Sequence, residues 1–503
     1  MNAKIKKQLR NCKRRIQRRL KKKQWVEQRR RMFQDKNIHY EIGAKTRGVH
    51  CGGIGAIHLL VQKLDFADVL DSRLHLLQRH VPYFESDHVL NMTYNLLAGG
   101  KCLEDIELLR NQETYLNLLG AQRIPDPTTE RDFLRRFQAE DVETLMDVIN
   151  DRRVRVWQQQ APEFFVHAII EGDGTLAETS GECKEGMDLS YDGTWGYHPL
   201  LISLANTQEP LFIYNRPASR PSHEQAAAYF DRALSLCRTA GFRQVSFRGD
   251  TDFTQTKHLD RWHAADVRFV FGIDAMPNLI ALAQAFPAGA WQALARPAAY
   301  EVKTRPRQRP VNVKEQVVRQ KGYTNIILVS EQVAECRYRP GHCQRNYRLV
   351  VVRKNLRIEE GGVKLRDELR YFFYLTNEET WTLADVIAFA NDRCNQENLI
   401  EQLKNGVCAM RLPVNTLVSN WAYMIIGALA WTFKAWLALL QPRAEHQRAL
   451  LTMEFKKFLQ ELMLLPCQVV RAGGRLIYRL LQWNPWVEVL FQGIEVLRAT
   501  RIT

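Results

Sequence analysis

The chain has 503 residues, 46% of them hydrophobic, which is enough for several packed domains and argues against a small disulfide-held or disordered protein. Its formal net charge is +16, but residues 1–31 contain 15 Lys or Arg and one acid, so the remainder carries only +2. The ten Cys are scattered without a framework spacing, which favours a reducing cytosol, and no apolar signal region is present.

The concentrated positive charge predicts a basic N-terminal arm over residues 1–38. Such a block binds polyanions by releasing their condensed counterions, so nucleic acid is the expected partner. Ile5, Leu9, Ile16 and Leu20 recur at near-helical spacing, with Cys12 on the same stripe. We expect charge repulsion to keep the arm loose until phosphates neutralise it.

Residues 39–160 carry helical apolar spacing nearly throughout, which predicts an all-helical region for DNA binding or dimerisation. Pro127 and the Thr residues after it start a helix with a basic face. Arg131 and Arg135 on that face are candidate contacts to DNA phosphates.

The pattern changes at Phe164, where short β-branched and aromatic runs begin to alternate with helical stretches. This order predicts an α/β core in two parts, residues 161–285 and 369–445. Residues 446–503 are expected to form a helix and a hairpin. The apolar run from Trp421 to Leu440 has the length of a membrane span, but we interpret it as a buried core helix and expect no membrane partner.

Residues 286–368 interrupt the α/β rhythm with Pro-rich basic loops and strand-like runs, which predicts an all-β insertion. The arginines Arg305, Arg307 and Arg309 make this insertion a candidate DNA contact. Trp291 and Tyr300 are candidate groups for stacking on bases.

Two aspartates directly follow buried strands of the predicted core. Asp173 lies in Glu171-Gly172-Asp173-Gly174-Thr175, and Asp250 follows Gly249. In α/β sheets functional residues gather at strand ends, where loops vary while the strands hold position. Asp192 could replace Asp173, although a hairpin turn is the simpler interpretation, and Asp252 could replace Asp250.

A third carboxylate lies on a long helix that we expect to start at the Thr382 cap and to continue past Lys404. At 100° per residue Arg393, Glu397 and Lys404 fall within about 40° of one another. The alternative is an exposed salt bridge between Arg393 and Glu397. Glu401 lies about 40° from Glu397 and could support it.

Three converging carboxylates would bind hard divalent cations through oxygen. Two such ions about 4 Å apart can activate the attacking oxygen and stabilise the leaving oxygen in a displacement at phosphorus. The neighbouring cations would hold DNA phosphates.

Asp173, Asp250 and Glu397, spaced by 77 and 147 residues, resemble the DDE triad of the retroviral-integrase-like, RNase H-like transposases. Arg393-x3-Glu397-x6-Lys404 is similar to the last three positions of the Tyr-(2)-Arg-(3)-Glu-(6)-Lys signature of bacterial insertion-sequence transposases. The chain departs at the first position, where Ala390 stands instead of Tyr. The longer second interval is similar to that of transposases in this family that carry a β-strand insertion before the catalytic Glu.

This resemblance implies an RNase H-like mixed sheet flanked by helices and an Mg²⁺-dependent enzyme in which Mn²⁺ can substitute. It implies binding of transposon terminal inverted repeats, two-metal cleavage, and joining of 3′-OH ends to target DNA. It also implies a homodimer in the DNA complex and a place in the bacterial cytoplasm, at the nucleoid. Two alternatives remain: a domesticated or inactive DNA-binding relative, and an enzyme that uses paired carboxylates on glycosides.

Overall fold

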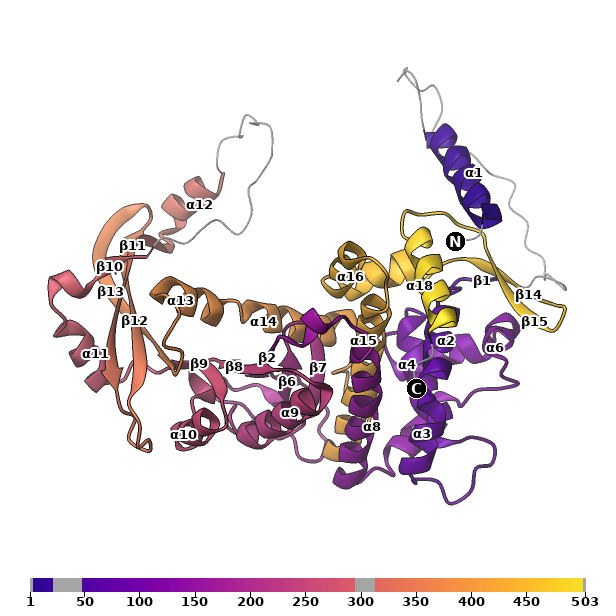
Figure 1. Ribbon diagram of the computed structural model, residues 1–503, viewed down its shortest axis with the longest axis horizontal. Coiled ribbons are helices and arrows are strands. Elements are labelled where there is room, and N and C mark those ends of the chain that lie inside the picture. Colours follow the sequence, from indigo (N-terminus) through magenta and orange to yellow (C-terminus); the bar gives the residue numbers. More distant parts are fainter. Residues whose placement is uncertain (1–2, 21–47, 295–312, 501–503) are drawn as a thin grey trace.

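Runs of β-branched and aromatic residues between positions 167 and 376 form one nine-stranded mixed sheet in the computed structural model, which describes residues 3–20, 48–294 and 313–500 (Figure 1). The strand order is β10-β11-β12-β13-β9-β8-β2-β6-β7, and the β2–β8 and β8–β9 pairs are parallel. The strands are β2 His167–Gly174, β6 Leu200–Leu204, β7 Glu209–Tyr214, β8 Gln244–Gly249, β9 Val267–Ile273, β10 Gln292–Ala293, β11 Thr324–Tyr338, β12 Tyr347–Glu360 and β13 Val363–Thr376. The chain therefore has the expected α/β class.

Helices cover both faces of this sheet. One face packs against α9 (Ala226–Ala240) and α10 (Thr256–Ala264). The other face packs against α13 (Leu383–Asn391) and α14 (Cys394–Glu401), which Figure 1 shows above the strands. The sheet is thus buried on two sides, as expected for strands with near-continuous apolar runs.

The region before the sheet is helical apart from one short strand. Its helices are α2 Ile54–Lys63, α3 Phe66–Arg73, α4 Glu85–Leu97, α5 Ile106–Arg110, α6 Glu113–Leu119, α7 Pro127–Leu134 and α8 Ala139–Trp157. The strand β1 (Gly48–Val49) pairs with β14 (Cys467–Ala472), which in turn pairs with β15 (Arg475–Leu480). The N-terminal helices and the C-terminal segment therefore share one body, where separate units were expected.

The apolar run at residues 421–440 is the centre of that body. It forms α15 (Leu417–Leu439), which is long and apolar enough to cross a membrane but is buried within the protein. It packs against α4, α8 and β7, and against α16 (Ala444–Leu451). After it come α17 (Phe455–Phe458), the π-helix η6 (Leu459–Met463) and α18 (Val487–Ala499). The interpretation as a core helix agrees with these contacts.

A buried carboxylate ties the helical body to the edge of the sheet. Glu209 of β7 accepts hydrogen bonds from the Arg153 guanidinium at 3.0 Å and from the indole nitrogens of Trp157 and Trp436, each at 2.9 Å. Arg153 and Glu209 are fully buried. Removing one partner of such a pair leaves an unpaired buried charge, which costs about 3–5 kcal/mol.

The segment expected to be an all-β insertion differs from the prediction in two ways. It contains helix α12 (Val313–Lys321), and its strands extend the core sheet, because β13 pairs with β9 from Phe373↔Ile273 to Thr376↔Val270. The expected boundary at residue 368 therefore lies inside a strand. The remaining elements near it are α11 (Pro277–Gln284) and the short 3-10 helices η3 (Thr251–Phe253) and η4 (Ala288–Ala290).

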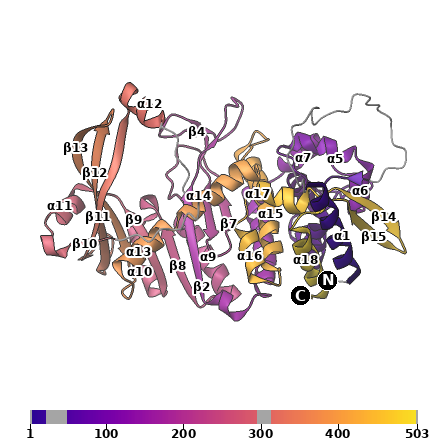
Figure 2. The same cartoon turned by 90° about the horizontal axis from the view of Figure 1, so that it is seen from above.

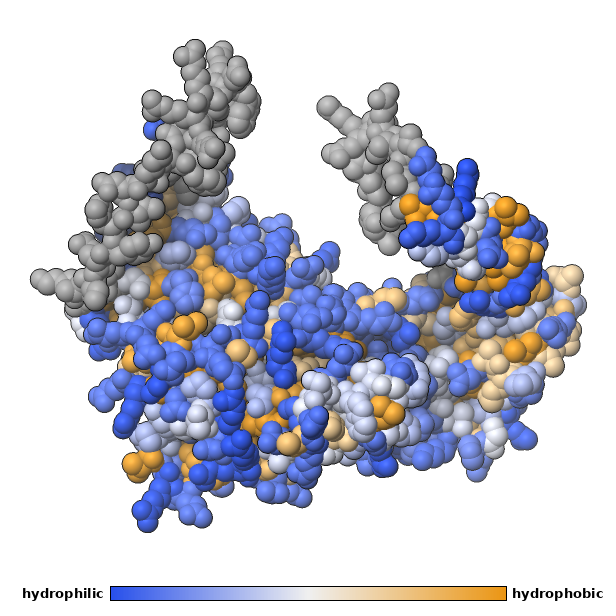
Figure 3. Space-filling model, turned by 180° about the vertical axis from the view of Figure 1, so that it is seen from behind, coloured by the Kyte–Doolittle hydropathy of each residue, from blue (hydrophilic) through white to orange (hydrophobic). Residues whose placement is uncertain are grey.

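The far halves of β11, β12 and β13 extend beyond the rest of the molecule (Figures 1 and 2). Apolar side chains such as Ile326, Leu328 and Leu369 are about half exposed there, at 50%, 49% and 54%. Figure 3 shows hydrophobic side chains among hydrophilic ones over this end. Helix α1 (Ala3–Leu20) rises at the opposite end of the molecule (Figure 1), so the arm is helical over these residues rather than loose.

Candidate active site

The register of two parallel strands brings Asp173 and Asp250 side by side. Gly172 of β2 is paired with Gly249 of β8, and each aspartate follows its glycine directly. Neighbouring strands lie about 4.8 Å apart, and residues in equivalent register point to the same face. The two carboxylates therefore share one face at one end of the sheet.

The space around Gly172 and Gly249 shows on which face of the sheet the two aspartates lie. A Cβ atom on Gly172 would lie 2.8 Å from the Phe230 ring of α9, and one on Gly249 would lie 2.8 Å from Phe253. Only glycine permits this close approach. Because side chains alternate along a strand, Asp173 points away from α9, toward the face that carries α14.

Burial and repulsion from Asp250 disfavour the ionised form of the Asp173 carboxyl. Burial, followed by the negative charge of Asp250, raises the pKa of the Asp173 carboxyl from 3.8 to about 7, although Arg393 opposes the shift. The pKa of Asp250 is also raised, first by burial, with Arg393 again opposing. Strongly perturbed carboxyl pairs of this kind gather at functional sites.

Arg393 connects the sheet to the third carboxylate. Its guanidinium lies 3.4 Å from the Asp250 carboxylate and 3.5 Å from Glu397. The Glu397 side chain is 54% exposed, and its negative charge also contributes to the raised pKa of Asp173. Glu397 thus faces the open side of this site rather than lying apart from it.

The helix that carries Glu397 is less regular than expected. It is interrupted at Asp392 and Arg393, between α13 and α14, and continues as a π-helix, η5 (Gln402–Gly406). A π-turn shifts the direction of later side chains, so an ideal 100° projection does not apply as far as Lys404. The buried Gln396 holds α14 to the sheet by donating to the Leu201 carbonyl at 3.2 Å.

Lys404 lies beside the loop that follows Asp173. Its ammonium donates to the Leu176 carbonyl at 2.7 Å and to the Thr175 hydroxyl at 3.4 Å. In this structure Lys404 therefore holds the loop after β2, whereas the sequence interpretation gave it a DNA phosphate.

Sequence reasoning missed a buried ion pair directly beneath the aspartates. Arg248 donates to Glu171 at 2.7 Å and to the Phe389 carbonyl of α13 at 2.6 Å. Glu171 and Arg248 are register partners and lie two residues before Asp173 and Asp250. The alternation of side chains along a strand could have revealed them, because Glu171 and Arg248 each stand two residues before an aspartate and carry opposite charges.

The alternative carboxylates Asp192 and Glu401 hold other positions, whereas Asp252 lies next to Asp250 and its charge contributes to the raised pKa of that carboxyl. Asp192 accepts from the Thr194 amide at 3.3 Å in the turn between β4 (Asp188–Leu189) and β5 (Trp195–Tyr197), which form a small sheet with β3 (Ala177–Glu178). Asp252 is exposed on η3, and its amide donates to Asp250 at 3.0 Å. Glu401 is exposed and accepts from Asn405 at 2.8 Å.

Three of the candidate DNA contacts are placed differently from the expectation. Trp291 is only 9% exposed, and the Arg353 guanidinium lies 4.1 Å from its ring centre, so the ring is not open to a base. Arg131 pairs with Glu104, and Arg135 pairs with Asp132 at 2.7 Å, so acids offset the basic face of α7. Tyr300, Arg305, Arg307 and Arg309 lie outside the described residues.

The carboxylates suit a hard divalent cation by donor type, since all three offer oxygen. The repulsion that raises the pKa of Asp173 is a surplus of negative charge that a cation would neutralise. Across residues 3–20, 48–294 and 313–500, however, no three Asp, Glu, His or Cys side chains already form a metal-binding group. Arg393 currently lies between Asp250 and Glu397.

Comparison with known proteins assigns the chain to a family. Residues 40–502 match a family of DDE transposases, enzymes that cut and rejoin DNA. Because the match spans most of the chain, the protein belongs to this family, described as Transposase DDE domain group 1. No curated protein matches the chain. A solved structure, the cryo-EM structure of a piggyBac transposase synaptic complex with hairpin DNA, is similar at 11% identity and a TM-score of 0.35, over 82% of this chain and 81% of that one.

Proposed function

We propose that this transposase cuts DNA at the terminal inverted repeats of its element and joins the 3′-OH ends to target DNA, using Asp173, Asp250 and Glu397 as the catalytic carboxylates. The observation that carries the proposal is the register of β2 and β8, which sets Asp173 beside Asp250. Arg393 then links Asp250 to Glu397 from the helix above.

The three carboxylates would hold Mg²⁺ or Mn²⁺, and two such ions would activate the attacking oxygen and stabilise the leaving one. The protein's own groups prepare this site. The buried Glu171–Arg248 pair fixes both strands below the aspartates and, through the Phe389 carbonyl, fixes the end of α13. Lys404 fixes the loop after Asp173.

Arg393 has two roles in this proposal. In the protein alone its guanidinium neutralises part of the charge on Asp250 and Glu397. When DNA is bound, the same fork can pair with a phosphate, since guanidinium–phosphate contacts are charge-assisted and geometrically specific. The side chain is 33% exposed, so it has room to turn toward the strand.

The finer assignment belongs to the same proposal. The parallel β2–β8–β9 strands with antiparallel β6 and β7 support an RNase H-like core. The Arg393, Glu397 and Lys404 spacing supports a bacterial insertion-sequence enzyme, although Ala390 replaces the signature Tyr. A homodimer in the DNA complex completes the proposal, with a place at the nucleoid in a bacterial cytoplasm, which the ten free cysteines support.

The test is metal-dependent cleavage and joining on a duplex that carries the ends of the element. Wild-type protein should act with Mg²⁺ and Mn²⁺ and should stop when the metal is chelated. Asp173→Ala, Asp250→Ala and Glu397→Ala should each abolish cleavage while end binding persists. Asp252→Ala is the matched control, and full activity is expected. Cleavage by Asp173→Ala at the wild-type rate would refute the assigned site.

A DNA-binding relative without catalysis is the second candidate. The observation that favours it is the position of Arg393, which lies where a metal-bound site would need free carboxylates. The same assay separates the two: end binding without cleavage under any divalent cation supports this candidate and contradicts the first.

A further inference from the structure

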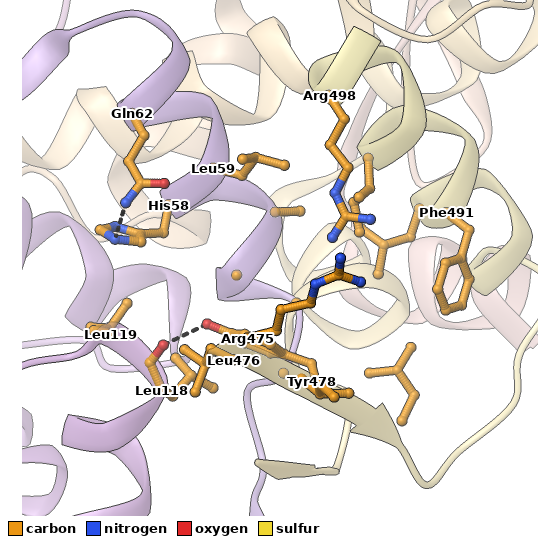
Figure 4. Close-up of a pocket in the computed structure, with 18 of the residues that line it drawn as sticks. His58, Leu59, Gln62, Leu118, Leu119, Arg475, Leu476, Tyr478, Phe491 and Arg498 are labelled. Carbon is orange, nitrogen blue, oxygen red and sulfur yellow. Dashed lines mark hydrogen bonds between the residues drawn. The ribbon is translucent and has the colours of Figure 1, made fainter. Parts of the chain in front are cut away.

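A pocket of about 800 Å³ lies at the opposite end of the molecule from β11–β13. Figure 4 shows it between α2 and the C-terminal elements β15 and α18. Its walls are mainly apolar and include Leu59, Leu476 and Phe491. Two cations line it as well: the guanidinium groups of Arg475 and Arg498 point toward each other (Figure 4).

Helix α1 of the basic arm lies against this pocket along one face. Ile5 is part of the pocket lining, Leu9 packs against the main hydrophobic core, and the Lys13 ammonium lies 5.6 Å from the ring centre of Trp483. Positions 5, 9 and 13 are one turn apart and share a helix face. Ile5 and Leu9 of the apolar stripe therefore lie on the side of α1 that contacts the body.

The other side of α1 is a row of exposed cations. Lys7, Arg14 and Arg18 are exposed and lie about 140–180° from Leu9 around the helix. Residues 3–20 contain nine Lys or Arg and no acid. Like charges one turn apart destabilise an isolated helix, so contacts along the apolar stripe must offset their repulsion.

We propose that the pocket between α2, β15 and α18 is the seat of the N-terminal helix, and that the seated helix forms, with Arg475 and Arg498, a second surface for duplex DNA, separate from the carboxylates. No ion pair of Arg475 or Arg498 is seen among the residues that the structure describes, although the acid Glu495 also lines the pocket. The Lys and Arg side chains of this surface would contact DNA phosphates, and such contacts carry no sequence information directly.

The DNA part of this inference rests on the proposed function, whereas the seat itself does not. A seated helix holds its charges in fixed positions before DNA arrives, so less conformational freedom is lost on binding than for a loose arm. Losing the seat should therefore weaken DNA binding without any change in charge.

The seat is tested first in full-length protein without DNA. A photoreactive benzoylphenylalanine in place of Leu9 should cross-link within the chain to residues 475–480 or 487–499, as mapped by mass spectrometry. The same group in place of Gln8, which is exposed, is the control and should not cross-link there. Cross-links to other segments or only between two chains would overturn the seat.

The DNA surface is tested by affinity for a short random duplex across a range of salt concentrations. Ile5→Ser with Leu9→Ser keeps the charge and should weaken binding about tenfold, whereas Gln8→Ser with Asn11→Ser should leave it unchanged. Arg475→Gln with Arg498→Gln should lower the log–log salt slope by up to about 1.8. The equally charged control, Arg443→Gln with Arg448→Gln on the surface near α16, should not.

The outcomes separate this inference from the proposed function. If the cross-links and slopes are as expected but no variant or wild type cleaves DNA, the surface stands and the catalytic proposal fails. If cleavage depends on Asp173 but Ile5→Ser with Leu9→Ser binds like wild type, the catalytic proposal stands and the seat is refuted.

Discussion

The charge on Asp173 leads to a prediction about stability without metal. The pKa of its carboxyl is raised from 3.8 to about 7, first by burial and then by Asp250. For a group whose folded-state pKa is raised, the stabilisation is complete below the unfolded-state pKa and is lost as the pH rises through the folded-state value. We predict that Asp173→Asn is more stable than wild type at about pH 8 in chelator, and equally stable near pH 4.

The size of the effect follows from the shift. A difference of roughly three pKa units corresponds to about 4 kcal/mol of unfolding free energy. This is an upper bound, because Asp173 is not fully buried and solvent screens part of the repulsion. We therefore expect the variant to gain between roughly 1 and 4 kcal/mol at about pH 8.

Thermal melts across this pH range measure the difference. Asp252→Asn is the matched control, since it removes an exposed carboxylate nearby. Added Mg²⁺ should raise the melting temperature of wild type and should do much less for Asp173→Asn, because the cation neutralises the charge that the variant lacks. The reasoning is refuted if Asp173→Asn melts at or below wild type near pH 8, or if the gap is the same near pH 4.

Three further substitutions test other contacts. Arg248→Met should destabilise the protein by about 3–5 kcal/mol, because it leaves Glu171 buried and unpaired. Adding Glu171→Leu should recover most of the lost melting temperature, and no recovery would contradict the pairing. Lys404→Ala should slow cleavage and joining with little change in melting, because the loop after Asp173 loses its anchor, and wild-type rates would rule this out. Trp291→Ala should lower stability by about 3–5 kcal/mol, and a loss of joining with unchanged melting would instead restore a stacking role.

The positions of the two aspartates were easier to predict than the contacts that surround them. Asp173 and Asp250 follow apolar β runs, and a strand end is visible in one sequence. Their adjacency depends on the β2–β8 pairing, which joins residues 77 positions apart and leaves no local trace. The Glu171–Arg248 pair was within reach, because alternation along each strand places it on the same face.

Other features of the site could not be predicted from the sequence, because they depend on contacts between distant segments. The break at Asp392 and the π-turn at 402–406 do not interrupt the apolar pattern, so the sequence predicts one regular helix. The partners of Lys404 lie about 228 residues away in the chain. Trp291 looks like a stacking group in a basic segment until Arg353 is seen to cover its ring.

The pairing of β13 with β9 has a mechanical consequence. Tyr374 of β13 is paired with Gly272 of β9, and a Cβ on Gly272 would lie 3.1 Å from the Thr251 amide nitrogen, immediately after Asp250. The same strand, β13, continues from the projecting end of the sheet to this pairing with β9 without an intervening loop. A displacement of the projecting strands would therefore move β9 and, with it, the turn that holds Asp250.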